Sequence, residues 1–73
     1  MTPGEIKNLI ETHLANSKAT VTSDDNVHFH AHVISPVFAN QSRVKQQQMV
    51  MQVLQDYIRR GEIHAIALKT EIL

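Results

Sequence analysis

The segment from Val27 to Ile34 alternates strictly between two kinds of side chain, and this pattern constrains the fold more than any other feature of the chain. One set of positions is apolar: Val27, Phe29, Ala31 and Val33. The other set carries three histidines and an isoleucine: His28, His30, His32 and Ile34. Successive side chains of a strand point to opposite faces. The segment therefore predicts a β-strand with an apolar face and a histidine face.

A second strand is predicted directly before this one. Residues Ala19–Ser23 alternate in the same way and are rich in β-branched side chains, while Asp24, Asp25 and Asn26 are typical of turns. The two segments together predict a β-hairpin. Pro36 ends the second strand, because proline has no N–H to donate to a central strand.

Two helices are predicted on either side of the hairpin. Thr2 and Glu5 have the spacing of a capping box, and the apolar residues that follow recur at helical intervals over Pro3–Ala15. The second and longer helix is predicted over Ser42–Gly61, with a serine as N-cap and a glycine where the helix stops.

A third strand is predicted over Ile63–Thr70, and both of its faces are partly apolar, which favours a strand covered on both sides. The element order is then α-β-β-α-β. This order predicts an α+β fold in which a small three-stranded mixed sheet carries both helices on one face. The crossover through the second helix favours a right-handed unit with its two strands parallel.

The length and the lack of cysteine limit the function classes. A chain of 73 residues predicts one domain over residues 1–73. Without cysteine there is no disulfide framework, no thiolate zinc site and no cysteine nucleophile, so histidines and carboxylates are the strong metal ligands that remain. No signal peptide or apolar run of about 20 residues is present. A soluble cytoplasmic protein is expected.

Charge and motifs also argue against two classes of function. Seven basic and seven acidic side chains give a net charge of zero, which removes the general attraction to phosphate backbones. The motifs of serine hydrolases, phosphate-binding loops and zinc proteases are missing, so catalysis by this chain alone is not expected. The basic first turn of the second helix, with Arg43 and Lys45, could contact phosphate, but a solvated turn is the favoured interpretation.

The five histidines are the compositional excess of this chain. His28, His30 and His32 lie on one strand face about 6 to 7 Å apart, a spacing that lets neighbours share a metal ion. The competing interpretation is an ordinary polar strand face. His64 begins the third strand, where it is either a metal ligand or a core-edge imidazole bonded to a backbone carbonyl. His13 lies in the apolar stripe of the first helix and is expected to be hydrogen-bonded and partly buried.

Several of these stretches together resemble the BolA-like family, and its IbaG branch in particular. The stretches that carry the resemblance are His28-Phe29, the run Val33–Lys45 with its Ser42-Arg43-Val44-Lys45, and the ending Ile63–Thr70. The resemblance covers essentially the whole chain. It implies the α-β-β-α-β fold similar to the type II KH arrangement, with a short helical turn before the long helix.

The resemblance also implies a function and a site. Members of the family share a bridging 2Fe-2S cluster with a glutathione-bound monothiol glutaredoxin, which implies roles in iron-sulfur trafficking, iron sensing and the stress response. The histidine of the last strand matches His64, and His28 is the best match to the second ligand, ahead of His30. The isolated chain is then expected to hold no cofactor. A homodimer is the alternative assembly for the chain alone.

Two positions depart from the family pattern. Asn40 stands where glycine is common, and asparagine tolerates a left-handed backbone better than most residues. Val44 stands where many members carry a histidine, as in the IbaG branch, so no ligand is expected there.

The alternative function is that of a KH-like nucleic-acid-binding transcriptional regulator. No GXXG loop is present to clamp a nucleic-acid backbone. This alternative therefore requires that folding assembles a basic face from the seven cationic residues. These are Lys7, Lys18, Arg43, Lys45, Arg59, Arg60 and Lys69.

Overall fold

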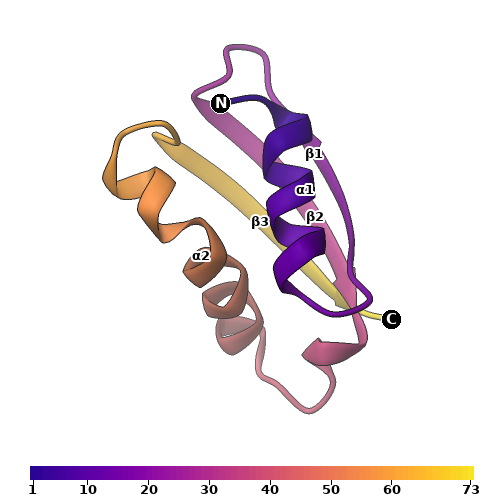
Figure 1. Cartoon of the computed structure of the whole chain (residues 1–73). Coiled ribbons are helices and arrows are strands. Elements are labelled where there is room, and N and C mark those ends of the chain that lie inside the picture. Colours follow the sequence, from indigo (N-terminus) through magenta and orange to yellow (C-terminus); the bar gives the residue numbers. More distant parts are fainter.

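The computed structural model describes all residues, 1–73. Both helices cover the same face of a single sheet, and the other face carries no element (Figure 1). The elements in chain order are α1 (Pro3–His13), β1 (Lys18–Thr22), β2 (His28–Ser35), the 3-10 turn η1 (Pro36–Phe38), α2 (Arg43–Arg59) and β3 (Ala65–Ile72). The predicted α-β-β-α-β order and fold class are thereby confirmed.

The sheet has the order β1-β2-β3, with β2 in the centre. β1 runs antiparallel to β2, so the predicted hairpin is present. β2 and β3 are parallel, as predicted from the crossover through α2, and His28 stands opposite Ala65 at the start of this pairing. The two parallel strands therefore begin at the same end of the sheet.

The core lies between the sheet and the two helices. The apolar face of β2 is buried as its alternation predicts, with Phe29 and Val33 at 2% and 0% exposure. These residues pack in one cluster with Ile6 and Ile10 of α1 and with Leu54 and other residues of α2. No helix combines the length and the apolar character needed to cross a membrane.

The helix caps follow the sequence closely. Thr2 and Glu5 form the predicted capping box, and the Ser42 hydroxyl accepts a hydrogen bond from the Lys45 N–H at 3.1 Å. α1 ends two residues earlier than predicted, because Leu14 already has an extended backbone. α2 ends at Arg59, and Gly61 follows with a φ of 77°, which a glycine adopts without strain.

β3 was placed two residues too early by the sequence pattern. The N–H groups of Glu62 and Ile63 both donate to the Tyr57 carbonyl, at 3.0 and 3.3 Å, so they still cap α2 and are not free to pair with β2. The expected cover on both faces was also wrong, because Ala65 and Ala67 are exposed on the open face of the sheet. The apolar pattern here reflects small side chains rather than a second buried face.

The two strands of the hairpin are also displaced from their predicted bounds by one residue. β1 starts and stops one position earlier, because the Ser23 hydroxyl donates to the His28 carbonyl at 2.6 Å and Ser23 thus belongs to the turn. β2 starts and stops one position later and continues through Ser35.

One buried polar contact joins α2, η1 and β3. Gln46 is 5% exposed, and its amide oxygen accepts a hydrogen bond from the Thr70 hydroxyl at 2.7 Å. Its amide nitrogen donates to the carbonyls of Phe38 and Gln41 at 3.3 and 3.0 Å. A glutamine in the first turns of a helix is usually exposed, so no pattern in the sequence indicates this role.

Candidate metal-binding site

His28 and His64 are neighbours at the start of the two parallel strands. Their ring centroids are 6.1 Å apart and their planes are inclined by 66°. The backbone produces this contact, because the Val27 carbonyl accepts the N–H groups of His64 and Ala65 at 2.8 and 3.3 Å. Both histidines are exposed. The two residues that the resemblance to the BolA-like family implies as ligands are therefore side by side at the surface.

His64 lies just before β3 rather than inside it. Its backbone N–H donates a hydrogen bond to the Val27 carbonyl, whereas its ring makes no hydrogen bond within the chain. The interpretation as a core-edge imidazole bonded to a carbonyl is thus wrong, since the side chain is exposed and free. A free imidazole at a fixed backbone position is what a metal ligand requires.

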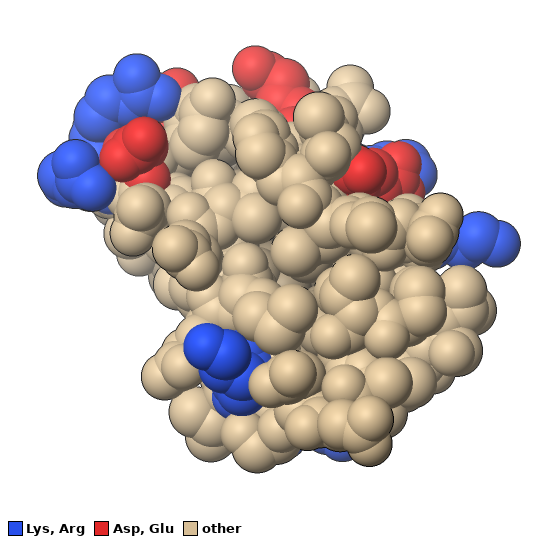
Figure 2. All heavy atoms as spheres, turned by 60° about the horizontal axis from the view of Figure 1, so that its bottom comes forward, with Lys and Arg blue, Asp and Glu red and all other residues tan.

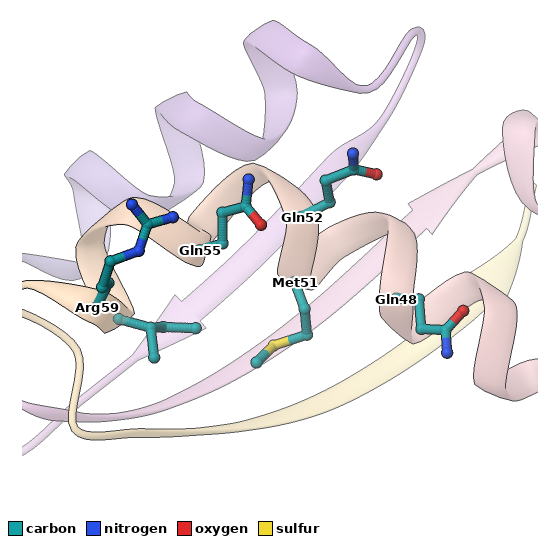
Figure 3. Close-up of a pocket in the computed structure, with 6 residues that line it drawn as sticks. Gln48, Met51, Gln52, Gln55 and Arg59 are labelled. Atoms are coloured by element: carbon teal, nitrogen blue, oxygen red, sulfur yellow. The ribbon is translucent and has the colours of Figure 1, made fainter.

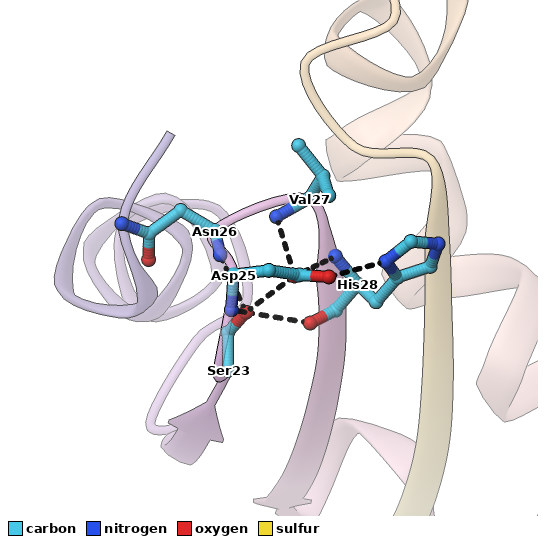
Figure 4. Close-up of polar contacts among 5 residues, drawn as sticks. All are labelled: Ser23, Asp25, Asn26, Val27 and His28. Carbon is cyan, nitrogen blue, oxygen red and sulfur yellow. Dashed lines mark hydrogen bonds and ion pairs between the residues drawn. The ribbon is translucent and has the colours of Figure 1, made fainter.

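The ring of His28 is oriented by the turn before it (Figure 4). Its Nδ1 lies 2.6 Å from Oδ2 of Asp25, and an ionised carboxylate can only accept, so Nδ1 donates. The other carboxylate oxygen of Asp25 accepts from the N–H groups of His28 and Val27 at 2.8 and 3.0 Å. Nε2 of His28 makes no hydrogen bond within the chain, so this nitrogen is available to bind a metal ion.

The same contacts determine the charge of Asp25. The backbone N–H of His28, then its ring N–H, and then the backbone N–H of Val27 hold the pKa of the Asp25 carboxyl far below its usual range. The carboxylate thus stays ionised at neutral pH. The sequence pattern predicts only a turn at Asp25, although an aspartate three positions before a candidate ligand is a detectable signal.

His30 and His32 share the strand face with His28 but do not join the pair. Nε2 of His32 donates to Oε1 of Glu71 at 2.7 Å, and this hydrogen bond lowers the pKa of the Glu71 carboxyl. His30 stands opposite Ala67, one step further along the sheet than the histidine pair. No group of three or more His, Cys, Asp or Glu side chains is placed to hold a metal ion. The candidate site therefore consists of the two imidazoles of His28 and His64.

His13 is in a different part of the molecule. Its Nδ1 donates to the Leu9 carbonyl at 2.8 Å, so the expected hydrogen bond is present. The expected partial burial was wrong, since the side chain is exposed at the last turn of α1. The ring of His13 is hydrogen-bonded to a carbonyl of its own helix and takes no part in the site.

Most of the basic side chains lie beside carboxylates. Four of the seven form ion pairs with carboxylates: Lys7, Arg59, Arg60 and Lys69. On the face seen in Figure 2, the basic groups stand apart, several of them beside acidic groups, and a wide uncharged surface lies between them. Arg43 and Lys45 remain exposed at the start of α2.

The largest surface groove also lies away from the histidine pair. It has a volume of about 520 Å³ and runs along α2, lined by Gln48, Met51, Gln52, Gln55, Ile58 and Arg59 (Figure 3). Its polar groups are neutral amides and one arginine that pairs with Asp56 at 3.0 Å. The groove carries no ligand set for a metal and no acid or base for catalysis.

The fold and the histidine pair define a small α+β domain that presents two adjacent imidazoles at the start of its parallel strands. The chain belongs to the BolA-like family, whose model matches residues 2–72. It is 33% identical over 69 residues to the acid stress protein IbaG of Escherichia coli, covering 94% of this chain and 81% of that protein. This similarity confirms the expected placement in the IbaG branch.

Two further comparisons agree with this assignment. A solved BolA protein homologue from Coxiella burnetii superposes with a TM-score of 0.86 at 33% identity, covering 99% of this chain and 91% of the other. An uncharacterised protein of Haemophilus influenzae is 48% identical over 46 residues, which are 63% of this chain and 54% of that protein. The fold and the family thus rest on both sequence and structure.

Proposed function

We propose that this chain is an adaptor that shares a 2Fe-2S cluster with a glutathione-bound monothiol glutaredoxin, in iron-sulfur trafficking or iron sensing. His64 and His28 are the ligands from this side, and the partner supplies thiolates. The observation that carries the proposal is the contact between the two rings, 6.1 Å apart and both exposed. A chain with two ligands and no third needs a partner to complete a cluster site.

The chemistry of the two side chains suits such a role. Imidazole nitrogens replace two thiolates on one iron in other 2Fe-2S centres, where they raise the reduction potential. Protons compete with metal ions for imidazole nitrogens, so such ligands leave more readily than thiolates. A cluster held in this way can be passed on or sensed. The role belongs to a compartment that keeps glutathione reduced, such as the cytoplasm, and requires no catalysis by this chain.

The test is to mix the purified protein with a cluster-loaded, glutathione-bound monothiol glutaredoxin and record visible circular dichroism. We expect a new spectrum with the wild type, none with His64→Ala, and a strongly weakened one with His28→Ala. His32→Ala is the matched control from the same strand face and should give the wild-type spectrum, because its ring is bound to Glu71.

Far-ultraviolet circular dichroism of each variant shows whether it is folded. A folded His64→Ala variant that still gives the wild-type visible spectrum would exclude the assigned ligand. Equal losses from all three variants would indicate a three-histidine site instead of the pair.

The nucleic-acid alternative has no specific observation in its favour, since four of the seven basic side chains are paired with carboxylates and the basic groups on the face in Figure 2 stand apart. The two functions also predict opposite effects of acid. Cluster sharing should weaken in acid, because protons compete with iron for the imidazole nitrogens, whereas nucleic-acid binding should strengthen as positive charge is gained and should fall steeply with salt. Titrations of both partners over pH and salt therefore distinguish the two functions.

A further inference from the structure

We propose that Asp25 is a positioning residue that holds His28 in the tautomer whose Nε2 is free to bind iron. The inference rests on the proposed function for the role of that nitrogen, while the tautomer itself is a property of the isolated chain. Asp25 does not touch the cluster. It acts through the ring of His28 (Figure 4).

Backbone hydrogen bonds fix the carboxylate of Asp25 independently of its contact with the His28 ring. Its Oδ1 accepts two backbone N–H groups, from His28 at 2.8 Å and from Val27 at 3.0 Å. These two bonds determine the direction in which Oδ2 points. Oδ2 therefore faces Nδ1 of His28, at 2.6 Å, without freedom to turn away.

The rest of the turn holds this geometry in place. The Ser23 hydroxyl donates to the His28 carbonyl at 2.6 Å and accepts the Asn26 N–H at 2.9 Å. Asn26 has a φ of 60°, a left-handed conformation that asparagine tolerates. The Ser23 hydroxyl thus connects the turn to the backbone of His28.

A neutral imidazole has one nitrogen that donates and one that accepts. With the N–H at Nδ1 taken by Asp25, the lone pair must be on Nε2. Carboxylates in this position recur behind metal-binding histidines, where they fix the ring and make it more basic, and their loss typically lowers metal affinity or activity by about 10–100-fold.

The decisive variant is Asp25→Asn, because it preserves the shape of the turn and reverses one hydrogen bond. The asparagine Oδ1 still accepts the two backbone N–H groups, so its NH₂ must face Nδ1 of His28 and donate to it. The proton of the ring then moves to Nε2, the nitrogen assigned to iron. The same kind of aspartate-to-asparagine change gives a wrong histidine tautomer in serine proteases.

The first readout is the nitrogen-15 spectrum of the histidine rings in the isolated chain, at a pH where the rings are neutral. We expect the proton of His28 on Nδ1 in the wild type and on Nε2 in Asp25→Asn, with the amide signals of Val27 and His28 retained. Asp24→Ala is the matched control, since Asp24 is exposed and adjacent and makes no hydrogen bond to the ring.

The second readout is the cluster-sharing titration with the loaded glutaredoxin, in which Asp25→Asn should bind about 10–100-fold more weakly than the wild type or Asp24→Ala. A proton on Nε2 in the wild type, or an unchanged tautomer in Asp25→Asn, would overturn the role of Asp25. A switched tautomer with unchanged cluster sharing would also overturn it. If the wild type itself shares no cluster, the proposed function fails, and the nitrogen-15 result still decides whether Asp25 sets the tautomer.

Discussion

At the scale of single residues, the five histidines differ in what their rings contact. His13 donates to a backbone carbonyl, His32 to Glu71 and His28 to Asp25, while His30 and His64 make no ring hydrogen bond within the chain. The sequence alone placed all three strand histidines on one face. It could not show which of them is already bound, because the partner of His32 is thirty-nine positions away in the chain.

Asn40 illustrates how a departure from the family pattern is accommodated. Its φ is 63°, the left-handed conformation for which glycine is common in the family. Asn40→Ala should lower the free energy of unfolding by about 1 kcal/mol, because a Cβ-bearing residue without a polar side chain is strained there. Asn40→Gly should change it by only a few tenths of a kcal/mol. Urea unfolding measures both, and equal losses in the two variants would contradict this explanation.

At the scale of the elements, patterns with a strict period were predicted best. The alternation of β2 and the caps of both helices led to the correct elements and the correct buried face. β3 was misplaced because the residues after Gly61 have strand-like composition while their N–H groups still cap α2. That assignment depends on hydrogen bonds, which composition does not contain.

The Thr70–Gln46 hydrogen bond joins β3 to α2 inside the core and lies outside what sequence patterns show. Thr70→Val should lower the free energy of unfolding by about 1–3 kcal/mol, because it leaves the buried amide oxygen of Gln46 without a donor. Thr70→Ser keeps the hydroxyl and is the control. Thermal or urea unfolding of both variants gives the comparison, and a valine variant as stable as the serine variant would show that Gln46 finds another donor.

At the scale of the whole molecule, three carboxyls have lowered pKa values in the folded chain. These are Glu11, bound by the Lys7 ammonium, Asp25, bound by N–H groups of His28, and Glu71, bound by the ring of His32. A carboxyl with a lowered pKa stabilises the fold above its ordinary pKa of about 4, and this stabilisation is lost as the pH falls through the lowered value. The folded state is therefore favoured at neutral pH and disfavoured in acid.

The urea midpoint of the isolated chain should consequently fall as the pH is lowered from about 5 toward 2. Glu71→Gln removes one of the three carboxyls, so this variant should lose less stability over the same range. Unfolding curves at several pH values give the comparison. A midpoint that rises in acid, or a steeper loss in Glu71→Gln, would show that other groups dominate.

The parallel pairing of β2 with β3 also links the formation of the histidine pair to the completion of folding. His28 and His64 are thirty-six positions apart, and β3 is the last element in chain order. The β1–β2 hairpin and the two helices form through local contacts, whereas β3 must close a long loop before it pairs. A chain in which β3 has not yet docked lacks the neighbour of His28. Only molecules in which β3 has docked therefore present the two imidazoles side by side, so the histidine pair forms as the last strand joins the sheet.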